Sequence, residues 1–183
     1  YYANEAETRE LFSGLGKDFS RLSLGCYFAE LTEALTAEGE ESGELLRHLL
    51  NGLYAIENFR RPPELLRAAF ELRAMSLAGY EPLLEGCASL GTERPEEPVR
   101  DRGGRGLRCR RGGSGGAGMP LDADALAAAR HVLYGDPKRL YGFTLGEESL
   151  RRLSAAAEAF TLAQLERGFR TLDYYKSLRG MEG

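Results

Sequence analysis

One aperiodic segment, residues 91–118, divides this chain of 183 residues into two parts that are otherwise helical in pattern. The segment contains Pro95 and Pro98, and eight glycines lie between residues 103 and 118. A segment so rich in glycine and so poor in apolar residues cannot bury enough surface to offset the entropy lost on ordering. The sequence therefore predicts a flexible loop at 91–118, with helical parts at residues 7–90 and 119–183.

Apolar residues in both helical parts recur every three or four positions, which is the period of an α-helix. We expect helices over residues 7–36, weakened near Gly16, and over residues 44–59. A third helix should begin at Pro62 and Pro63 and end at Gly79, and a fourth should span residues 121–134. Thr144 and Glu147 form a capping-box pattern, after which one unbroken helix is expected to about residue 178. The predicted fold class is an all-α helical bundle.

The same periodicity predicts which side chains face the core. Cys26 falls on the apolar face of the first helix and is expected to be buried. The expected inner face of the second helix is formed by Leu46, Leu49, Leu50, Leu53, Tyr54 and Ile56. His48 and His131 are lone histidines on amphipathic helices, with no carboxylate or thiol at the spacing of a metal site or a catalytic dyad. Structural roles are expected for both.

Basic charge is concentrated in one short segment, although the formal net charge of the whole chain is -4. Residues 1–98 contain 9 Lys and Arg against 18 Asp and Glu, whereas residues 100–111 contain six arginines against one acid. The arginines are Arg100, Arg102, Arg105, Arg108, Arg110 and Arg111. A flexible cationic segment can neutralise phosphates by a salt-dependent contact that does not depend on sequence, so these are candidate DNA-binding residues. The alternative interpretation is a solvated linker without a ligand.

Several functional classes lack support in the sequence. It contains no phosphate-binding GxxxxGK[ST] loop, no GxGxxG after a strand, no GxSxG elbow and no HExxH helix, so we predict no enzyme activity. No apolar run approaches the roughly 20 residues of a membrane span. Three cysteines do not make a disulfide framework and suit a reducing cytoplasm. The chain begins Tyr1-Tyr2 without a signal pattern, and we interpret it as part of a longer protein.

A set of local motifs nevertheless resembles one family in order and spacing. The residues that carry the resemblance are Tyr27-Phe28-Ala29-Glu30-Leu31, Phe70-Glu71-Leu72-Arg73, Gly79-Tyr80, Cys87, Gly106-Leu107-Arg108-Cys109 and Tyr174-Tyr175-Lys176-Ser177-Leu178. Together they resemble the C-terminal helical domain of RecO, a bacterial recombination-repair protein. The family begins with a small OB-fold barrel, of which only a remnant at residues 1–6 is expected here.

The resemblance also implies a metal site that this sequence has partly lost. Many family members carry two CxxC pairs that suit a structural zinc site with four thiolates. Here the corresponding stretches are Cys87-Ala88-Ser89-Leu90 and Cys109-Arg110-Arg111-Gly112, so each keeps one cysteine. We regard Cys87 and Cys109 as vestigial positions and predict no zinc and no other cofactor. Without zinc to fix it, the 91–118 loop should be more flexible than in zinc-bearing relatives.

What the resemblance implies about function is a binding role in bacterial DNA repair and homologous recombination. RecO-like proteins bind single-stranded DNA, promote annealing and, with RecR, help to load recombinase onto strands coated by single-strand-binding protein. The expected partners are single-stranded DNA, RecR and the acidic, apolar C-terminal tail of single-strand-binding protein, in the cytoplasm near the nucleoid. The competing hypothesis is a helical scaffold for protein contacts without any nucleic-acid role, which the acidic balance of residues 1–98 would favour.

Overall fold

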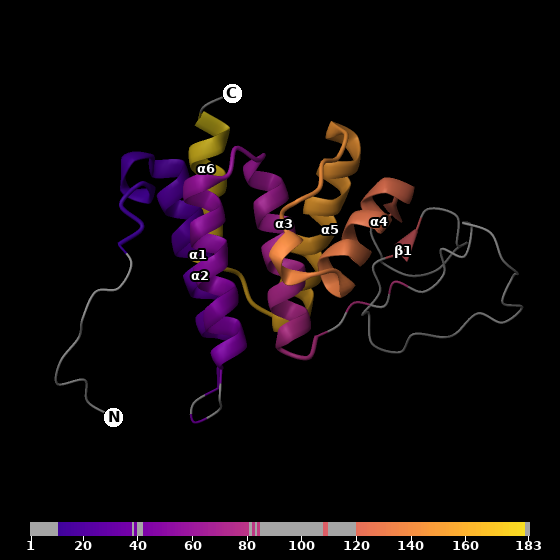
Figure 1. Cartoon of the computed structure of the whole chain (residues 1–183), viewed down its shortest axis with the longest axis horizontal. Coiled ribbons are helices and arrows are strands. Elements are labelled where there is room, and N and C mark those ends of the chain that lie inside the picture. Colours follow the sequence, from indigo (N-terminus) through magenta and orange to yellow (C-terminus); the bar gives the residue numbers. More distant parts are fainter. Residues whose placement is uncertain are drawn as a thin grey trace, which may run out of the picture.

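The structure is a computed structural model, and it describes residues 11–37, 39, 42–80, 82, 84, 108–109 and 120–181. Within these residues the chain forms a bundle of six α-helices (Figure 1). The helices are α1 (Phe19–Leu35), α2 (Gly43–Asn58), α3 (Pro63–Leu77), α4 (Ala123–Tyr134), α5 (Glu147–Leu165) and α6 (Arg170–Met181). Two 3-10 turns, η1 (Leu15–Lys17) and η2 (Pro137–Arg139), accompany them. The predicted all-α fold is confirmed.

The exception to helical structure is a pair of two-residue strands. β1 (Arg108–Cys109) pairs in parallel with β2 (Pro120–Leu121), directly before α4. Leu121 is buried in the core, which anchors this end of the pair. The rest of the 91–118 segment and residues 1–6 lie outside the described residues, so the flexible loop and the barrel remnant remain predictions.

Helix α3 occupies the centre of the bundle. Figure 1 shows it between a group formed by α1, α2 and α6 and a second group formed by α4 and α5. It packs against α1, α2, α4 and α5, and its Glu64 forms an ion pair with Arg179 of α6. Ten of its fifteen residues are buried. The remaining helices cover it with Leu, Ala and aromatic side chains, so one continuous core runs through both sequence halves.

Local sequence signals account for the ends of several helices. Pro63 stands in the first turn of α3, where its missing N–H costs no hydrogen bond. Gly79 has a φ of +85°, and the N–H of Tyr80 reaches back to the Met75 carbonyl at 2.8 Å, which closes α3 with a Schellman motif. Both predicted boundaries of α3 are therefore confirmed. In the same way, the carboxylate of Asp18 accepts the Ser20 N–H at 2.9 Å and begins α1.

Other predicted boundaries are wrong. Helix α1 begins only at Phe19, because Asp18 caps it and residues 15–17 form the tighter turn η1. Thr144 is not a cap either: Gly146 occupies the N-cap position of α5, without a side-chain hydrogen bond. The expected unbroken final helix ends at Leu165, since Glu166 takes a left-handed conformation with φ +50°. This break lets α6 fold back and pack on α1, where Phe169 meets Tyr27 edge-to-face at 5.6 Å.

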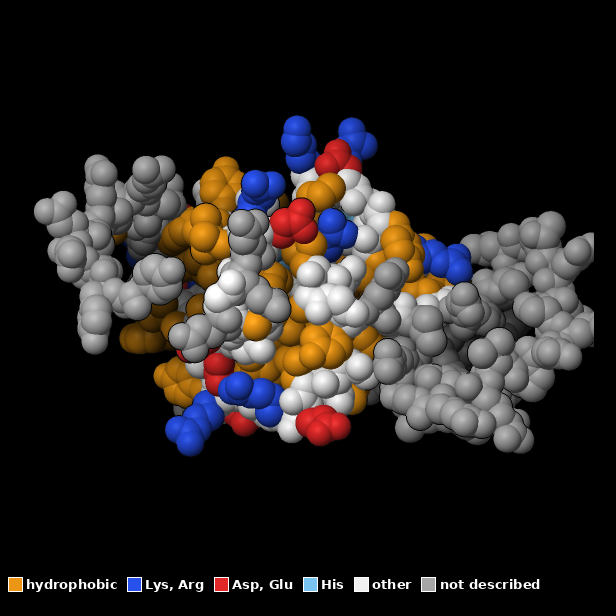
Figure 2. Space-filling view, turned by 90° about the horizontal axis from the view of Figure 1, so that it is seen from below, with side chains coloured by type: hydrophobic (Ala, Val, Ile, Leu, Met, Phe, Trp, Pro, Cys, Tyr) orange, Lys and Arg blue, Asp and Glu red, His pale blue; other side chains and the backbone are white. Residues whose placement is uncertain are grey.

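Two predicted core faces also need correction. Cys26 is exposed, because the inner face of α1 is formed instead by Leu24, Tyr27, Phe28 and Leu31. On α2 the buried residues are Leu45, His48, Gly52, Ala55 and Ile56, whereas the predicted Leu46, Leu50 and Tyr54 are exposed and Leu49 and Leu53 only partly buried. Apolar side chains thus remain at the surface, as they do over the middle of the face in Figure 2.

A buried polar network crosses the core beside this apolar packing. The Arg67 guanidinium donates to Glu71 at 2.9 Å, to Glu158 at 2.8 Å and to Ser154 at 2.7 Å. The Tyr27 hydroxyl donates to the same Glu71 oxygen at 2.8 Å. Burial raises the pKa of the Glu71 carboxyl even though Arg67 opposes the shift. The network joins α1, α3 and α5, so these groups fix how the helices pack.

Candidate functional site

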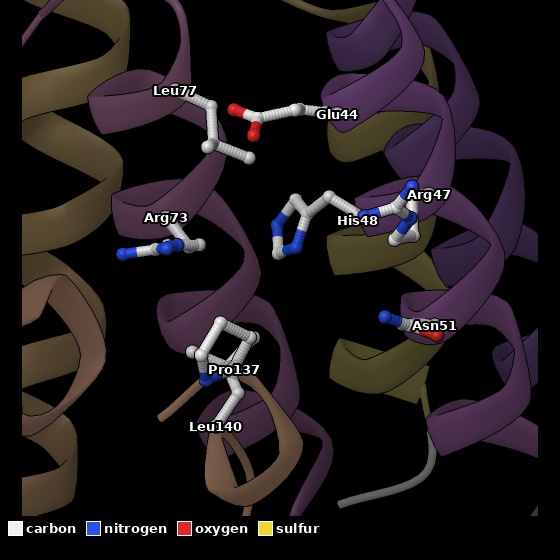
Figure 3. Close-up of a pocket in the computed structure, with 8 residues that line it drawn as sticks. All are labelled: Glu44, Arg47, His48, Asn51, Arg73, Leu77, Pro137 and Leu140. Carbon is white, nitrogen blue, oxygen red and sulfur yellow. The ribbon is translucent and has the colours of Figure 1, made fainter. Parts of the chain in front are cut away.

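A pocket opens between α2, α3 and η2 (Figure 3). Helix α2 contributes Glu44, Arg47, His48 and Asn51, and helix α3 contributes Arg73 and Leu77. The η2 turn contributes Pro137, and Leu140 follows directly after it. Figure 3 shows the His48 ring pointing from α2 toward α3, with Leu77 above it and Pro137 and Leu140 below. The pocket therefore combines an apolar lining with two arginines and one carboxylate.

Close aromatic packing under α2 holds the His48 side of the pocket in place. The rings of Phe28 and Phe70 stack with centroids 3.7 Å apart, and His48 stacks on Phe70 at 4.4 Å. Gly52 makes room for this stack, because a Cβ there would lie 2.8 Å from the Phe70 ring. The three rings and the glycine give the pocket a rigid base.

The hydrogen bond of His48 determines which ring nitrogen carries the proton. Nε2 lies 3.0 Å from the Phe70 carbonyl oxygen, so Nε2 carries the proton and Nδ1 remains an acceptor. Burial lowers the pKa of His48 to about 4, and the nearby charge of Arg73 acts in the same direction. The imidazole is therefore neutral near pH 7, and it contributes a flat apolar surface rather than a charge.

The two arginines are held differently. Arg73 Nη1 donates to the Leu133 carbonyl oxygen at 2.5 Å, so its guanidinium is fixed at the C-terminal end of α4, where a cation is favourable. Arg47 lies on the exposed face of α2 and has no ion pair among the described residues. One hydrogen-bonded and one solvent-exposed guanidinium near an apolar lining suit a ligand that carries both acidic and apolar groups.

The size of the pocket limits its ligand. Its cavity volume is about 100 Å³, below the roughly 300 Å³ at which small-molecule and cofactor sites begin. It is also partly open to solvent, so it does not enclose a reacting group away from water. These dimensions favour the side chain of a docked peptide over a cofactor or an enzyme substrate.

The structure does not describe the side chains of the predicted DNA-binding arginines. Arg100, Arg102, Arg105, Arg110 and Arg111 lie outside the described residues, and Arg108 is described only as part of β1. Cys87 also lies outside them, and Cys109 is described only as the partner of Leu121 in the strand pair. The DNA-binding and zinc predictions for these residues stay predictions.

Sequence analysis missed the pocket because its residues come from three distant segments. Arg73 belongs to the motif at residues 70–73, and Arg47 and Asn51 are four positions apart on one face of α2, but neither signal indicates a shared site. His48 was expected to be structural, and its bond to the backbone of Phe70 agrees with that expectation. His131 likewise contacts a backbone oxygen, that of Arg139, at 2.9 Å.

The described residues hold neither a membrane-spanning helix nor a metal-binding cluster. None of their helices combines the length and the apolar character needed to cross a bilayer. They also contain no cluster of three or more His, Cys, Asp or Glu side chains placed to hold a metal ion.

Comparison with known proteins places the chain in a family. The profile described as "Recombination protein O C terminal" matches residues 16–173. The "DNA repair protein RecO" of Symbiobacterium thermophilum is 29% identical over 96% of this chain and 71% of that protein, and that of Acetivibrio thermocellus is 23% identical over 97% and 71%. The protein of the same name from Alkaliphilus metalliredigens is 35% identical over 50% of this chain and 37% of its own length. No solved structure matches. The match over most of the helical bundle shows that this chain belongs to the RecO family of DNA repair proteins, through its C-terminal domain.

Proposed function

We propose that this chain acts in DNA repair and homologous recombination as a binding module, without catalytic chemistry of its own. The family match carries this proposal, because it spans nearly the whole described bundle and the matched relatives are named DNA repair proteins. The proposed ligands are single-stranded DNA and single-strand-binding protein, with RecR as a further partner in annealing and recombinase loading. The proposed setting is the bacterial cytoplasm near the nucleoid, and no bound cofactor is required.

Within this role, the pocket between α2, α3 and η2 is proposed to hold the tail of single-strand-binding protein. That tail is acidic and ends in apolar residues, and helix-lined pockets with cationic rims accept such peptides. Leu77 and Leu140 would contact an apolar side chain, and Arg47 and Arg73 would pair with carboxylates. Glu44 at the rim would repel acidic residues placed on its side, so it would orient the peptide.

The test is the affinity of an acidic peptide with an apolar C-terminal end, measured by fluorescence anisotropy. Arg47→Ser and Leu77→Ala should each weaken binding about tenfold, the typical effect of losing one charged or apolar anchor. Arg170→Ser is the matched control, because Arg170 is exposed on α6, does not line the pocket and has no ion pair among the described residues. Equal affinity in Arg47→Ser, Leu77→Ala and the parent chain would place the peptide elsewhere.

The alternative is a helical scaffold that contacts only proteins. The observation that favours it is the exposed apolar stripe of Leu46, Leu50 and Tyr54 on α2, which is typical of helices that bind a partner. Single-stranded DNA affinity at two salt concentrations separates the two hypotheses. DNA binding that weakens with salt supports the repair module, whereas no binding at either salt concentration supports the scaffold.

A further inference from the structure

The connection between α5 and α6 turns the chain through an unfavourable backbone conformation. Residues 166–169 separate the end of α5 at Leu165 from the start of α6 at Arg170, and they are called the α5–α6 hinge below. Glu166 has a φ of +50°, in the left-handed region that residues with a Cβ rarely adopt. Its side chain is exposed and forms no ion pair or hydrogen bond within the described part of the chain. The strain at Glu166 is therefore not offset by any contact of its own side chain.

The sequence across the hinge favours a helix that continues instead of turning. Leu165, Phe169 and Leu172 follow one another at intervals of four and three residues, the spacing of one helical face. Glu166 is a good helix former, and Gly168 is the one strongly unfavourable residue in the hinge. Local sequence preference and the observed turn therefore oppose each other at this point.

Contacts with a distant helix hold α6 in its position. Phe169 is buried and meets Tyr27 of α1 edge-to-face at 5.6 Å. The Glu30 carboxylate of α1 accepts the Thr171 N–H at 3.1 Å, so a side chain of one helix caps the beginning of another. Figure 1 shows α5 and α6 in the two groups on either side of α3, and the hinge crosses between these groups.

Ion pairs with two further helices fix the rest of α6. Arg179 pairs with Glu64 of α3 at 2.5 Å, and Lys176 pairs with Glu158 of α5 at 2.5 Å. Neither these pairs nor the contacts with α1 require that α6 belong to the same molecule as the helices that it covers. An α6 helix from a second copy of the chain can make all of them.

We propose that this chain exchanges α6 with a second copy of itself and forms a domain-swapped dimer. In this dimer α5 and α6 of each copy join into one continuous helix, and each α6 packs on α1, α3 and α5 of the other copy. The left-handed conformation of Glu166 disappears from both hinges, and short strained hinges of this kind favour such exchange. The exchange gives up the contacts of the hinge itself, among them the pair of Arg167 with Glu30 at 3.6 Å.

The path to the dimer determines how it must be prepared. Phe169, Leu172 and Tyr175 are buried, so α6 leaves its position only when these side chains become exposed to water. Exchange is therefore expected during refolding at high protein concentration rather than on mixing folded chains. The inference goes beyond the proposed function and does not depend on it, because no residue that lines the pocket between α2, α3 and η2 lies on α6.

The first experiment changes only the conformational preference of the hinge. The whole chain and its variants are refolded from denaturant over a range of protein concentrations, and chromatography with light scattering measures the dimer. Glu166→Gly should lower the dimerisation constant about a hundredfold, because glycine accepts a positive φ and each of two hinges contributes about tenfold. Glu166→Val should raise the constant about tenfold, since a β-branched residue tolerates a positive φ least.

Two further variants are the matched controls for this experiment. Glu166→Gln removes the charge but keeps the size and the backbone preference, so it should dimerise like the parent chain. Ala163→Val introduces the same β-branched residue at an exposed position of α5, where the backbone is helical in both forms. It should also dimerise like the parent. Circular dichroism confirms that each variant has refolded.

The second experiment identifies α6 as the exchanged element. Glu64→Arg and Arg179→Glu each place like charges against one another in the monomer and in a dimer of identical chains. When the two variants are refolded together, the swapped mixed dimer restores an opposite-charge pair at both α3–α6 contacts. Native mass spectrometry should show the mixed dimer about threefold above its statistical proportion, the effect of two partly exposed ion pairs.

Several results would overturn the inference. Equal dimerisation of the parent, Glu166→Gly and Glu166→Val would show that the hinge does not control association. A statistical proportion of mixed dimers would show that the copies meet through another surface. Monomers at every concentration, in the parent and in the charge-exchange mixture, would show that α6 does not exchange. If Glu166→Val does not fold, the proportion of mixed dimers decides by itself.

Discussion

Two sides of the bundle carry several Lys and Arg residues, but in different ways. One is the side of α5 and α6. The other is the side where α2, α3, the end of α4 and η2 adjoin, called the basic surface below, with Arg47, Arg60, Arg61, Arg73, Arg130, Lys138 and Arg139. On α5 and α6, Arg151 and Arg152 pair with Glu148, Lys176 pairs with Glu158, and Arg179 pairs with Glu64. Just before α6, Arg167 pairs with Glu30 and stacks 4.9 Å above the Phe169 ring. On the basic surface, none of the seven cations has an acidic partner among the described residues.

This difference separates charges that organise the fold from charges that remain for a ligand. Hydrogen bonds from Arg151 and Arg152 lower the pKa of the exposed Glu148 carboxyl, as expected when opposite charges are matched within one helix. Like charges without acidic partners repel one another and add no ion pair to the fold, yet they attract phosphate. The pairing of charges, rather than their number, distinguishes the two sides.

The largest expected effect on stability comes from the buried polar network that joins α1, α3 and α5. Arg67→Met should lower the free energy of unfolding by about 3–5 kcal/mol, because it leaves the buried Glu71 without its cation. Chemical denaturation measures the change. The double variant Arg67→Met/Glu71→Gln should recover most of it, since the amide still accepts the Tyr27 hydroxyl and no buried charge remains on α3. A loss below 1 kcal/mol in the single variant would show that the network does not hold the helices together.

The next effect concerns His48, which lies beneath the basic surface. Its pKa of about 4 in the folded state is lower than the ordinary value of 6.5, so the unfolded chain binds more protons between these pH values. The contribution of His48 to the free energy of unfolding is fully present above pH 6.5. It decreases by about 3 kcal/mol as the pH falls to 4. His48→Gln keeps a donor for the Phe70 carbonyl and should remove this pH dependence.

Denaturation of the parent and His48→Gln across pH 4–7 isolates the histidine. The raised pKa of Glu71 acts in the opposite direction, because a carboxyl that gains protons on folding stabilises the fold as the pH falls. That contribution is common to both proteins and cancels in their difference. An unchanged pH dependence in the variant would mean that His48 is not held neutral.

A third, smaller effect tests the rigid base of the pocket. Gly52→Ala should destabilise the bundle by about 1–3 kcal/mol, the usual cost of overpacking, because its Cβ would approach Phe28 and Phe70 within 3 Å. Peptide affinity at the pocket should fall as well, since the stacked rings must move. Gly16→Ala is the matched control, as nothing lies within 4 Å of its added Cβ. Similar stability of the two variants would show that the ring stack yields easily.

The smallest effects should come from exposed charges on both sides. Arg151→Ser should change the free energy of unfolding by less than about 1 kcal/mol, because its ion pair with Glu148 is exposed to solvent. Arg60→Ser should change it by about 0.5 kcal/mol at most, since Arg60 has no described partner to lose. Thermal unfolding of both variants measures these values. A large loss in Arg60→Ser would reveal a structural partner and would end the contrast between the two sides.

Much of the fold follows from local sequence signals. Pro63 and Gly79 delimit α3, and Asp122 caps α4 by accepting the Ala125 N–H at 2.9 Å. Leu126, Ala129 and Val132 recur at helical spacing on one face of α4, and all three are buried. These features depend on neighbouring residues and on backbone conformations that particular residue types prefer, so they can be recognised without a tertiary structure.

The choice of inner face on α2 could not be predicted in the same way. Two apolar stripes lie side by side on this helix, and helical period alone does not decide between them. The structure buries the stripe with Gly52 and His48, because the Phe28 and Phe70 rings need the space above a glycine. The fold-back at Glu166 was missed for a similar reason, since the packing of Phe169 on α1 is a contact between distant segments.

The sequence by itself determined the helical character of both parts, the approximate bounds of α2, α3 and α4, the aperiodic segment at 91–118 and the family, because each rests on local pattern or on motifs in order. Only the tertiary structure decided which basic residues share a surface and which polar residues share the core. Arg73, Leu77 and Leu140 line one pocket, and Arg60 and Arg139 join one surface, through contacts between segments that lie up to about 80 residues apart. Such proximity follows from the packing of buried faces, which no local stretch of sequence specifies.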